Sequence, residues 1–126
     1  MKHVELRVEI SRYIVVASLR LPERDISREH ELQREKESMN ASSVKGLILG
    51  LEHITEPVEL DIITSPGYLT IGLNALEKWQ QDNYIKPDGT AVRHKELWMK
   101  AAELLEQHKW KIIQEKKKPE PSMQKE

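Results

Sequence analysis

The order of the hydrophobic periodicities along the chain limits its fold more than any other feature. Every second residue from position 4 to position 10 is aliphatic: Val4, Leu6, Val8 and Ile10. This alternation predicts a half-buried strand over residues 4–10. The β-branched residues between positions 13 and 21 predict a second strand, and residues 22–25 predict a turn after it.

Residues 28–38 fit two structures, because almost all of them are charged and Leu32 is the only large aliphatic residue among them. They could form a helix with Ser27 as its N-cap. They could also form an edge strand, where charges discourage pairing with other chains. We favour the edge strand, because a third strand completes an antiparallel meander.

A helical spacing follows, with one apolar stripe: Val44, Leu47, Ile48, Leu51 and Ile54. Asn40 or Ser42 is expected to cap this helix. Gly46 and Gly50 lie within it, and we expect them to allow close packing against a sheet. Residues 58–64 then read as a strand. A strand, a helix and a strand in this order predict a parallel pair.

The second half of the chain repeats the helical spacing twice. Ser65 and Pro66 are expected to open a helix with four inward side chains: Leu69, Leu73, Leu76 and Trp79. A loop over residues 82–93 leads to a helix over 95–108 and a last strand over 109–113. Residues 115–126 are predicted to be a disordered charged tail, and residues 1–114 one domain.

The predicted fold class is therefore α/β. The five-stranded mixed sheet joins an antiparallel three-strand meander to a parallel core, with about three helices. The chain has no cysteine, which excludes disulfides, thiolate metal sites and cysteine nucleophiles. Its formal net charge of -1 gives no overall basic field. No stretch approaches the roughly 20 apolar residues that span a bilayer. We expect a soluble cytoplasmic protein without a membrane partner.

Three segments together resemble the ribonuclease H (type 1) family. Residues 40–52 begin with Asn40 and end in Leu-Glu, like the first helix of that family. Residues 63–69 resemble its strand-to-helix junction, written Thr-Asp-Ser-x-Tyr-Val. Trp79 resembles the Trp-containing helix end of the family, and residues 83–86 resemble its basic handle loop. Residues 92–98 resemble its Val-Lys-Asn-x-Asp-Leu-Trp motif. The resemblance covers roughly residues 40–113 and implies a ribonuclease-H-like fold.

Members of that family cleave the RNA strand of an RNA–DNA hybrid with two divalent cations held by four carboxylates. Here the first three of those positions fall on Glu9, Ser43 and Ser65, and a charged tail stands where the fourth is expected. A neutral serine is a weak ligand for magnesium. We therefore assign no catalytic or metal-binding residue, and we expect magnesium only if the family activity survives. Glu9 is alternatively an ordinary solvated strand residue.

The resemblance also implies a set of nucleic-acid-binding residues: Asn40, Lys86, Arg93 and Lys95, with Trp79 and Tyr84 as stacking or packing aromatics. Two plainer interpretations stand beside it. Asn40 could be only a helix cap, and the loop could be only a solvated loop with Trp79 and Trp98 in the core.

Three hypotheses for function follow. The first is a catalytically inactive ribonuclease-H-like protein that binds an RNA–DNA hybrid or another nucleic-acid duplex. The second is a protein–protein interaction module of the same fold, with a protein partner or a second copy, that contacts no nucleic acid. The third is a residual metal-dependent ribonuclease.

Overall fold

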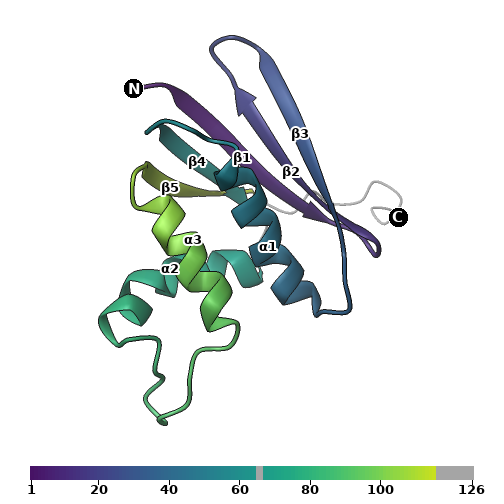
Figure 1. Cartoon of the computed structure of the whole chain (residues 1–126). Coiled ribbons are helices and arrows are strands. Elements are labelled where there is room, and N and C mark those ends of the chain that lie inside the picture. Colours follow the sequence, from purple (N-terminus) through teal and green to yellow (C-terminus); the bar gives the residue numbers. More distant parts are fainter. Residues whose placement is uncertain (65–66, 116–126) are drawn as a thin grey trace, which may run out of the picture.

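A computed structural model describes residues 1–64 and 67–115. Its five strands form one mixed sheet (Figure 1) and have these bounds: β1 His3–Ile10, β2 Ile14–Leu21, β3 Ile26–Gln33, β4 Glu59–Thr64 and β5 Lys109–Gln114. The strand order in the sheet is β3-β2-β1-β4-β5. The β1–β2 and β2–β3 pairs are antiparallel, whereas β1–β4 and β4–β5 are parallel. The predicted meander and parallel core are both confirmed.

The ambiguous charged segment forms the edge strand β3, which ends at Gln33 rather than at residue 38. The helical alternative is wrong for this segment. Strand β3 pairs with β2 along its whole length, from Leu21 opposite Ile26 to Ile14 opposite Gln33. The exposed position of β3 explains why its sequence carries charges in place of an alternating apolar pattern.

Three helices connect the strands: α1 Met39–Glu52, α2 Tyr68–Gln81 and α3 Lys95–Leu105. The N-cap of α1 is Ser38, whose hydroxyl accepts a hydrogen bond from the Ala41 amide at 3.1 Å. The prediction of Asn40 or Ser42 as the cap is therefore wrong, because both residues lie inside the helix. Ser38 has the extended backbone that an N-cap requires, with φ −67° and ψ 160°.

The starts and ends of the other two helices differ slightly from expectation. The predicted opening of α2 at Ser65 and Pro66 lies outside the described residues, and α2 begins at Tyr68. Helix α3 ends at Leu105 rather than at His108. The His108 ring is buried, and its Nδ1 accepts a hydrogen bond from the Val58 amide at 3.2 Å. This contact with the segment before β4 places His108 beyond the helix end.

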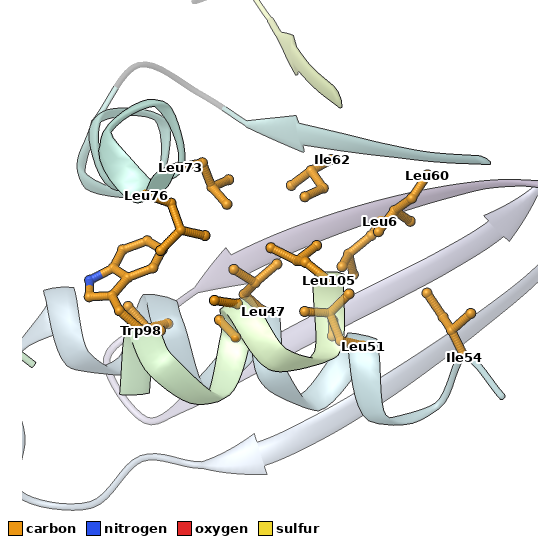
Figure 2. Close-up of a cluster of buried hydrophobic side chains, with 14 of the residues drawn as sticks. Leu6, Leu47, Leu51, Ile54, Leu60, Ile62, Leu73, Leu76, Trp98 and Leu105 are labelled. Atoms are coloured by element: carbon orange, nitrogen blue, oxygen red, sulfur yellow. The ribbon is translucent and has the colours of Figure 1, made fainter. Parts of the chain in front are cut away.

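The core lies between the helices and one face of the sheet. Figure 2 shows its aliphatic and aromatic side chains meeting from both layers: Leu6, Leu60 and Ile62 from strands, and Leu47, Leu51, Leu73, Leu76, Trp98 and Leu105 from helices. The expected close packing at the α1 glycines is confirmed. A Cβ added at Gly46 would lie 2.6 Å from side-chain carbons of Val8 and Val15, so α1 can approach β1 and β2 only without side chains there.

The described part of the chain contains no helix that is both long enough and apolar enough to cross a membrane.

Candidate nucleic-acid interface

The N-terminal ends of the three helices meet at one end of the molecule (Figure 1). The hydroxyl of Ser38, at the start of α1, lies 3.5 Å from Nε2 of His94, at the start of α3. The ring of Tyr68, at the start of α2, packs edge-on against the His94 ring, with 6.4 Å between centroids. His94 thus contacts the first residues of the two other helices.

This arrangement directs three helix dipoles toward the same region. The N-terminus of a helix carries a partial positive charge and unpaired backbone N–H groups. The first turns of α1 and α2 contain no acidic residue, and the first turn of α3 contains only Glu96. The residues at the N-cap positions of α2 and α3, Gly67 and His94, make no side-chain capping hydrogen bond. The region therefore favours an anion such as a phosphate group.

His94 has a left-handed backbone, with φ 59° and ψ 36°. This conformation is unfavourable in free energy for a residue other than glycine, and residues that adopt it cluster at functional sites. The sequence analysis assigned no binding role to Ser38 or to His94. A signal for His94 was present, because it occupies the Asn position of the Val-Lys-Asn-x-Asp-Leu-Trp motif. Ser38 gave no comparable signal.

Three of the predicted binding residues lie beside these helix ends. Asn40 is exposed in the first turn of α1. Arg93 is exposed immediately before His94, and Lys95 is half-buried at the first position of α3. Their side chains add two positive charges to the three helix N-termini.

The fourth basic residue, Lys86, is exposed in the 82–93 loop, which projects away from the helices (Figure 1). Backbone hydrogen bonds order this loop: the Lys86 amide donates to the Thr90 carbonyl at 2.8 Å, and the Val92 amide donates to the Tyr84 carbonyl at 2.9 Å. These bonds close the loop on itself between Tyr84 and Val92.

The two aromatic residues predicted near this loop pack in the structure. Tyr84 is only 7% exposed, and burial raises the pKa of its phenol. Trp79 is half-buried, and its ring lies edge-on to Trp98 with 5.5 Å between centroids. The indole of Trp98 in turn donates to the Tyr68 hydroxyl at 3.0 Å. Tyr84 thus packs in the core, and Trp79 packs against Trp98 while part of its side chain remains exposed.

Acidic residues of the loop have local partners. The Asp88 carboxylate accepts from the Thr90 hydroxyl at 2.6 Å and from the Thr90 amide at 3.0 Å, which lowers its pKa. Asp82 forms an ion pair with Lys78 at 3.4 Å. Part of the negative charge of the loop is therefore compensated before any ligand binds.

The positions that the resemblance assigns to metal ligands do not fit two magnesium ions. Val8 faces Gly46 of α1, so its neighbour Glu9 points to the opposite face of the sheet. The Ser43 hydroxyl is buried and donates to the Met39 carbonyl at 2.9 Å within α1. Ser65 lies outside the described residues. Over residues 1–64 and 67–115, no group of three or more acidic or histidine side chains is placed to hold a metal ion.

Sequence comparisons find ribonucleases H among characterised proteins. The ribonuclease H of Caldanaerobacter subterraneus subsp. tengcongensis is 30% identical over 76 residues, which cover 59% of this chain and 50% of that protein. The ribonuclease H of Clostridium botulinum is 28% identical over 79 residues, covering 61% and 53%. The chain thus spans about half the length of these relatives. No protein-family model matches the sequence.

Comparison of structures gives the same fold. LC9-RNase H1, a type 1 RNase H with the type 2 active-site motif, has a TM-score of 0.74 at 13% identity, covering 92% of this chain and 64% of that one. A foamy viral protease-reverse transcriptase in complex with RNA/DNA hybrid has a TM-score of 0.69 at 12% identity, covering 91% and 17%. RNase H1 from Halobacterium salinarum has a TM-score of 0.59 at 16% identity, covering 91% and 85%. The chain therefore has a ribonuclease-H-like fold.

Proposed function

We propose that this protein binds a nucleic-acid duplex, such as an RNA–DNA hybrid, at the surface where its three helices begin, and does not cleave it by the two-metal chemistry of ribonuclease H. The contacts of His94 with Ser38 and Tyr68 carry this proposal. They bring three helix N-termini together beside Arg93 and Lys95.

The chemistry of this surface suits a phosphate backbone. Arg93 and Lys95 supply permanent positive charges, and the helix ends supply backbone N–H groups that the N-cap residues of α2 and α3, Gly67 and His94, do not bind through a side chain. The 82–93 loop adds Lys86 at a second position, so two phosphates of one duplex could be contacted at once. Such contacts position a duplex without reading its sequence.

The proposed absence of cleavage rests on the positions that correspond to the metal-binding carboxylates of ribonuclease H. Glu9 and the α1 N-terminus lie on opposite sides of the sheet, and Ser43 is neutral with its hydroxyl engaged inside α1. Two hard cations need several converging carboxylates. One isolated glutamate does not supply them.

A salt-titrated binding assay with a labelled RNA–DNA hybrid tests the binding. We expect the logarithm of the affinity to fall linearly with the logarithm of the salt concentration. The double variant Lys86→Ala, Arg93→Ala should bind more weakly and reduce the slope by about 2, since each phosphate contact contributes roughly 0.9. Arg28→Ala, Lys109→Ala is the matched control, because it removes the same charge from exposed strand positions. No binding at low salt, or equal loss in both variants, would contradict the proposal.

A second assay tests the chemistry separately. The labelled hybrid is incubated with the protein and either Mg²⁺ or Mn²⁺, and we expect the hybrid to remain intact. Cleavage that disappears in Glu9→Gln would show that a metal site has been rebuilt around this residue.

A further inference from the structure

The face of the sheet turned away from the helices is uncovered in the described part of the chain, although three of its strands are parallel. Helix α1 packs on β1 and β2 through Gly46 and Gly50, and α3 packs beside α1 on the same side. Gly72 of α2 packs against Trp98 of α3, which places α2 in this layer too. All-parallel sheets occur almost only in proteins that cover both faces of the sheet. In this mixed sheet, the parallel strands β1, β4 and β5 thus have one face without a covering layer among the described residues.

We name this second surface the open face. It consists of the strand residues whose side chains alternate with the core residues, and it is hollowed in two places. One hollow of about 280 Å³ is lined by residues of β1, β2, β3 and β4, including Glu5, Arg7, Glu9, Glu29 and Ile63. The other, of about 480 Å³, lies near the starts of the parallel strands and is lined by His3, Asp61 and Lys111 among others.

The open face has apolar side chains within a charged surround. Ile63 of β4 and Ile113 of β5 are cross-strand neighbours in the sheet. Ile113 is 38% exposed, and Ile63 and Val16 are half-buried. Strands of antiparallel sheets commonly carry polar side chains on a face that is in water, and these aliphatic side chains depart from that pattern.

The charges of the open face are unbalanced toward acid. Three of its cations already have partners: Arg7 pairs with Glu115, Arg20 lies 3.6 Å from Glu5, and Lys111 lies 3.9 Å from Asp61. By contrast, four of its carboxylates form no ion pair within the described residues, namely Glu9, Glu29, Glu31 and Glu59, whereas one cation, Lys109, forms none. Glu9 and Glu31 are the cross-strand neighbours of Val16 from its two sides. The acidic surplus therefore borders an aliphatic side chain.

We propose that the open face binds an amphipathic helix of a partner protein, with aliphatic residues against Ile63 and Ile113 and with lysine or arginine residues beside Glu9, Glu29 and Glu31. A helix is the element that covers the faces of parallel sheets. A second copy that docks through the same face would bring like charges together, and its carboxylates would repel. This surface is separate from the helix N-termini, so its partner and a nucleic acid can bind together.

The test uses a labelled 20-residue helical peptide of leucine and lysine, with the leucines at the 3.6-residue spacing. We expect the peptide to bind the whole chain. Adding it should shift only the NMR signals of residues whose side chains lie on the open face. Ile113→Glu should weaken peptide binding about tenfold or more. The double variant Glu29→Lys, Glu31→Lys should also weaken it, and this loss should be larger at low salt than at high salt. A leucine–glutamate peptide of the same spacing should not bind.

Two matched variants separate docking from general effects of charge. Met99→Glu changes an exposed apolar residue of α3, and Glu77→Lys, Glu106→Lys reverses two exposed carboxylates of the helical layer. Both should leave peptide binding unchanged. The proposal is overturned if these controls weaken binding as much as the open-face variants, if the shifts fall on the helical layer, or if no peptide binds. It is also overturned if sedimentation shows a dimer that Ile113→Glu dissociates, because the occupant would then be a second copy.

Discussion

The Nε of Arg34 donates a hydrogen bond to the hydroxyl of Ser42 at 2.9 Å, and that hydroxyl donates to the Glu37 carboxylate at 2.6 Å. The same guanidinium donates to three backbone carbonyls: those of Ser11, Arg12 and Glu37. Lys45 closes the network at 2.9 Å from Glu37, and the pKa of the Glu37 carboxyl is lowered by Ser42 first and by Lys45 second. One arginine thereby joins the β1–β2 turn to the start of α1.

Removing this arginine should therefore cost more stability than removing an ordinary surface arginine. We expect Arg34→Ala to lower the free energy of unfolding by about 2–4 kcal/mol, because the fully buried Ser42 hydroxyl and several carbonyls lose a charged donor. Arg28→Ala is the control, since the one hydrogen bond described for Arg28 goes to its neighbour Ser27, and it should change stability by less than about 0.5 kcal/mol. Urea unfolding of both variants measures the difference, and equal losses would contradict the role of the network.

This network also explains why the start of α1 could not be located from the sequence. Ser38, Asn40 and Ser42 are all favoured N-cap residues, so local propensity does not choose among them. The choice depends on Arg34 and Glu37, which bind the Ser42 hydroxyl and remove it from capping. Similarly, the end of α3 depends on the hydrogen bond from Val58 to His108, which lies 50 residues away in sequence.

The elements themselves could be predicted because their patterns are local. The alternation from Val4 to Ile10 predicts a strand. The glycines on the apolar stripe of α1 predict a helix that packs closely on a sheet. The charged strand β3 was predicted from its place in the meander. In the candidate site, the basic residues could be named from the resemblance. The meeting of Ser38 with His94 could not, because 56 residues separate them and only packing of α1 against α3 unites them.

Packing between α2 and α3 should be sensitive to one added methyl group. A Cβ at Gly72 would overlap the ring of Trp98, which is completely buried. We expect Gly72→Ala to destabilise the protein by about 1–3 kcal/mol, although alanine is the better helix former. Asn74→Ala, at an exposed position of the same helix, should be neutral or slightly stabilising. Thermal unfolding of the two variants tests this, and a stabilised Gly72→Ala would show that Trp98 can move aside.

Protonation of His108 should destabilise the fold at mildly acidic pH. Burial lowers the pKa of its imidazole below the ordinary value of 6.5, and its Nδ1 accepts a hydrogen bond that a protonated ring could not accept. The unfolded chain therefore takes up a proton near pH 6.5 while the folded chain does not. The stability contributed by the neutral ring is complete above this pH and is lost as the pH falls. Urea unfolding of His108→Gln should give a free energy of unfolding that varies less between pH 7 and pH 5 than that of the unchanged protein.

The free edge of β3 should depend on its charges to remain unpaired. Within the described residues β3 pairs only with β2, and its exposed side chains include Glu29 and Glu31. Replacing both with valine removes the charge repulsion and raises strand propensity, so a second chain can add to the edge. We expect Glu29→Val, Glu31→Val to form larger species in size-exclusion chromatography as protein concentration rises. Glu103→Val, Glu106→Val adds the same apolar surface at the end of α3, where the strand-pairing groups of an edge are absent. If this control associates equally, then added hydrophobicity alone is responsible and the edge of β3 needs no protection by charge.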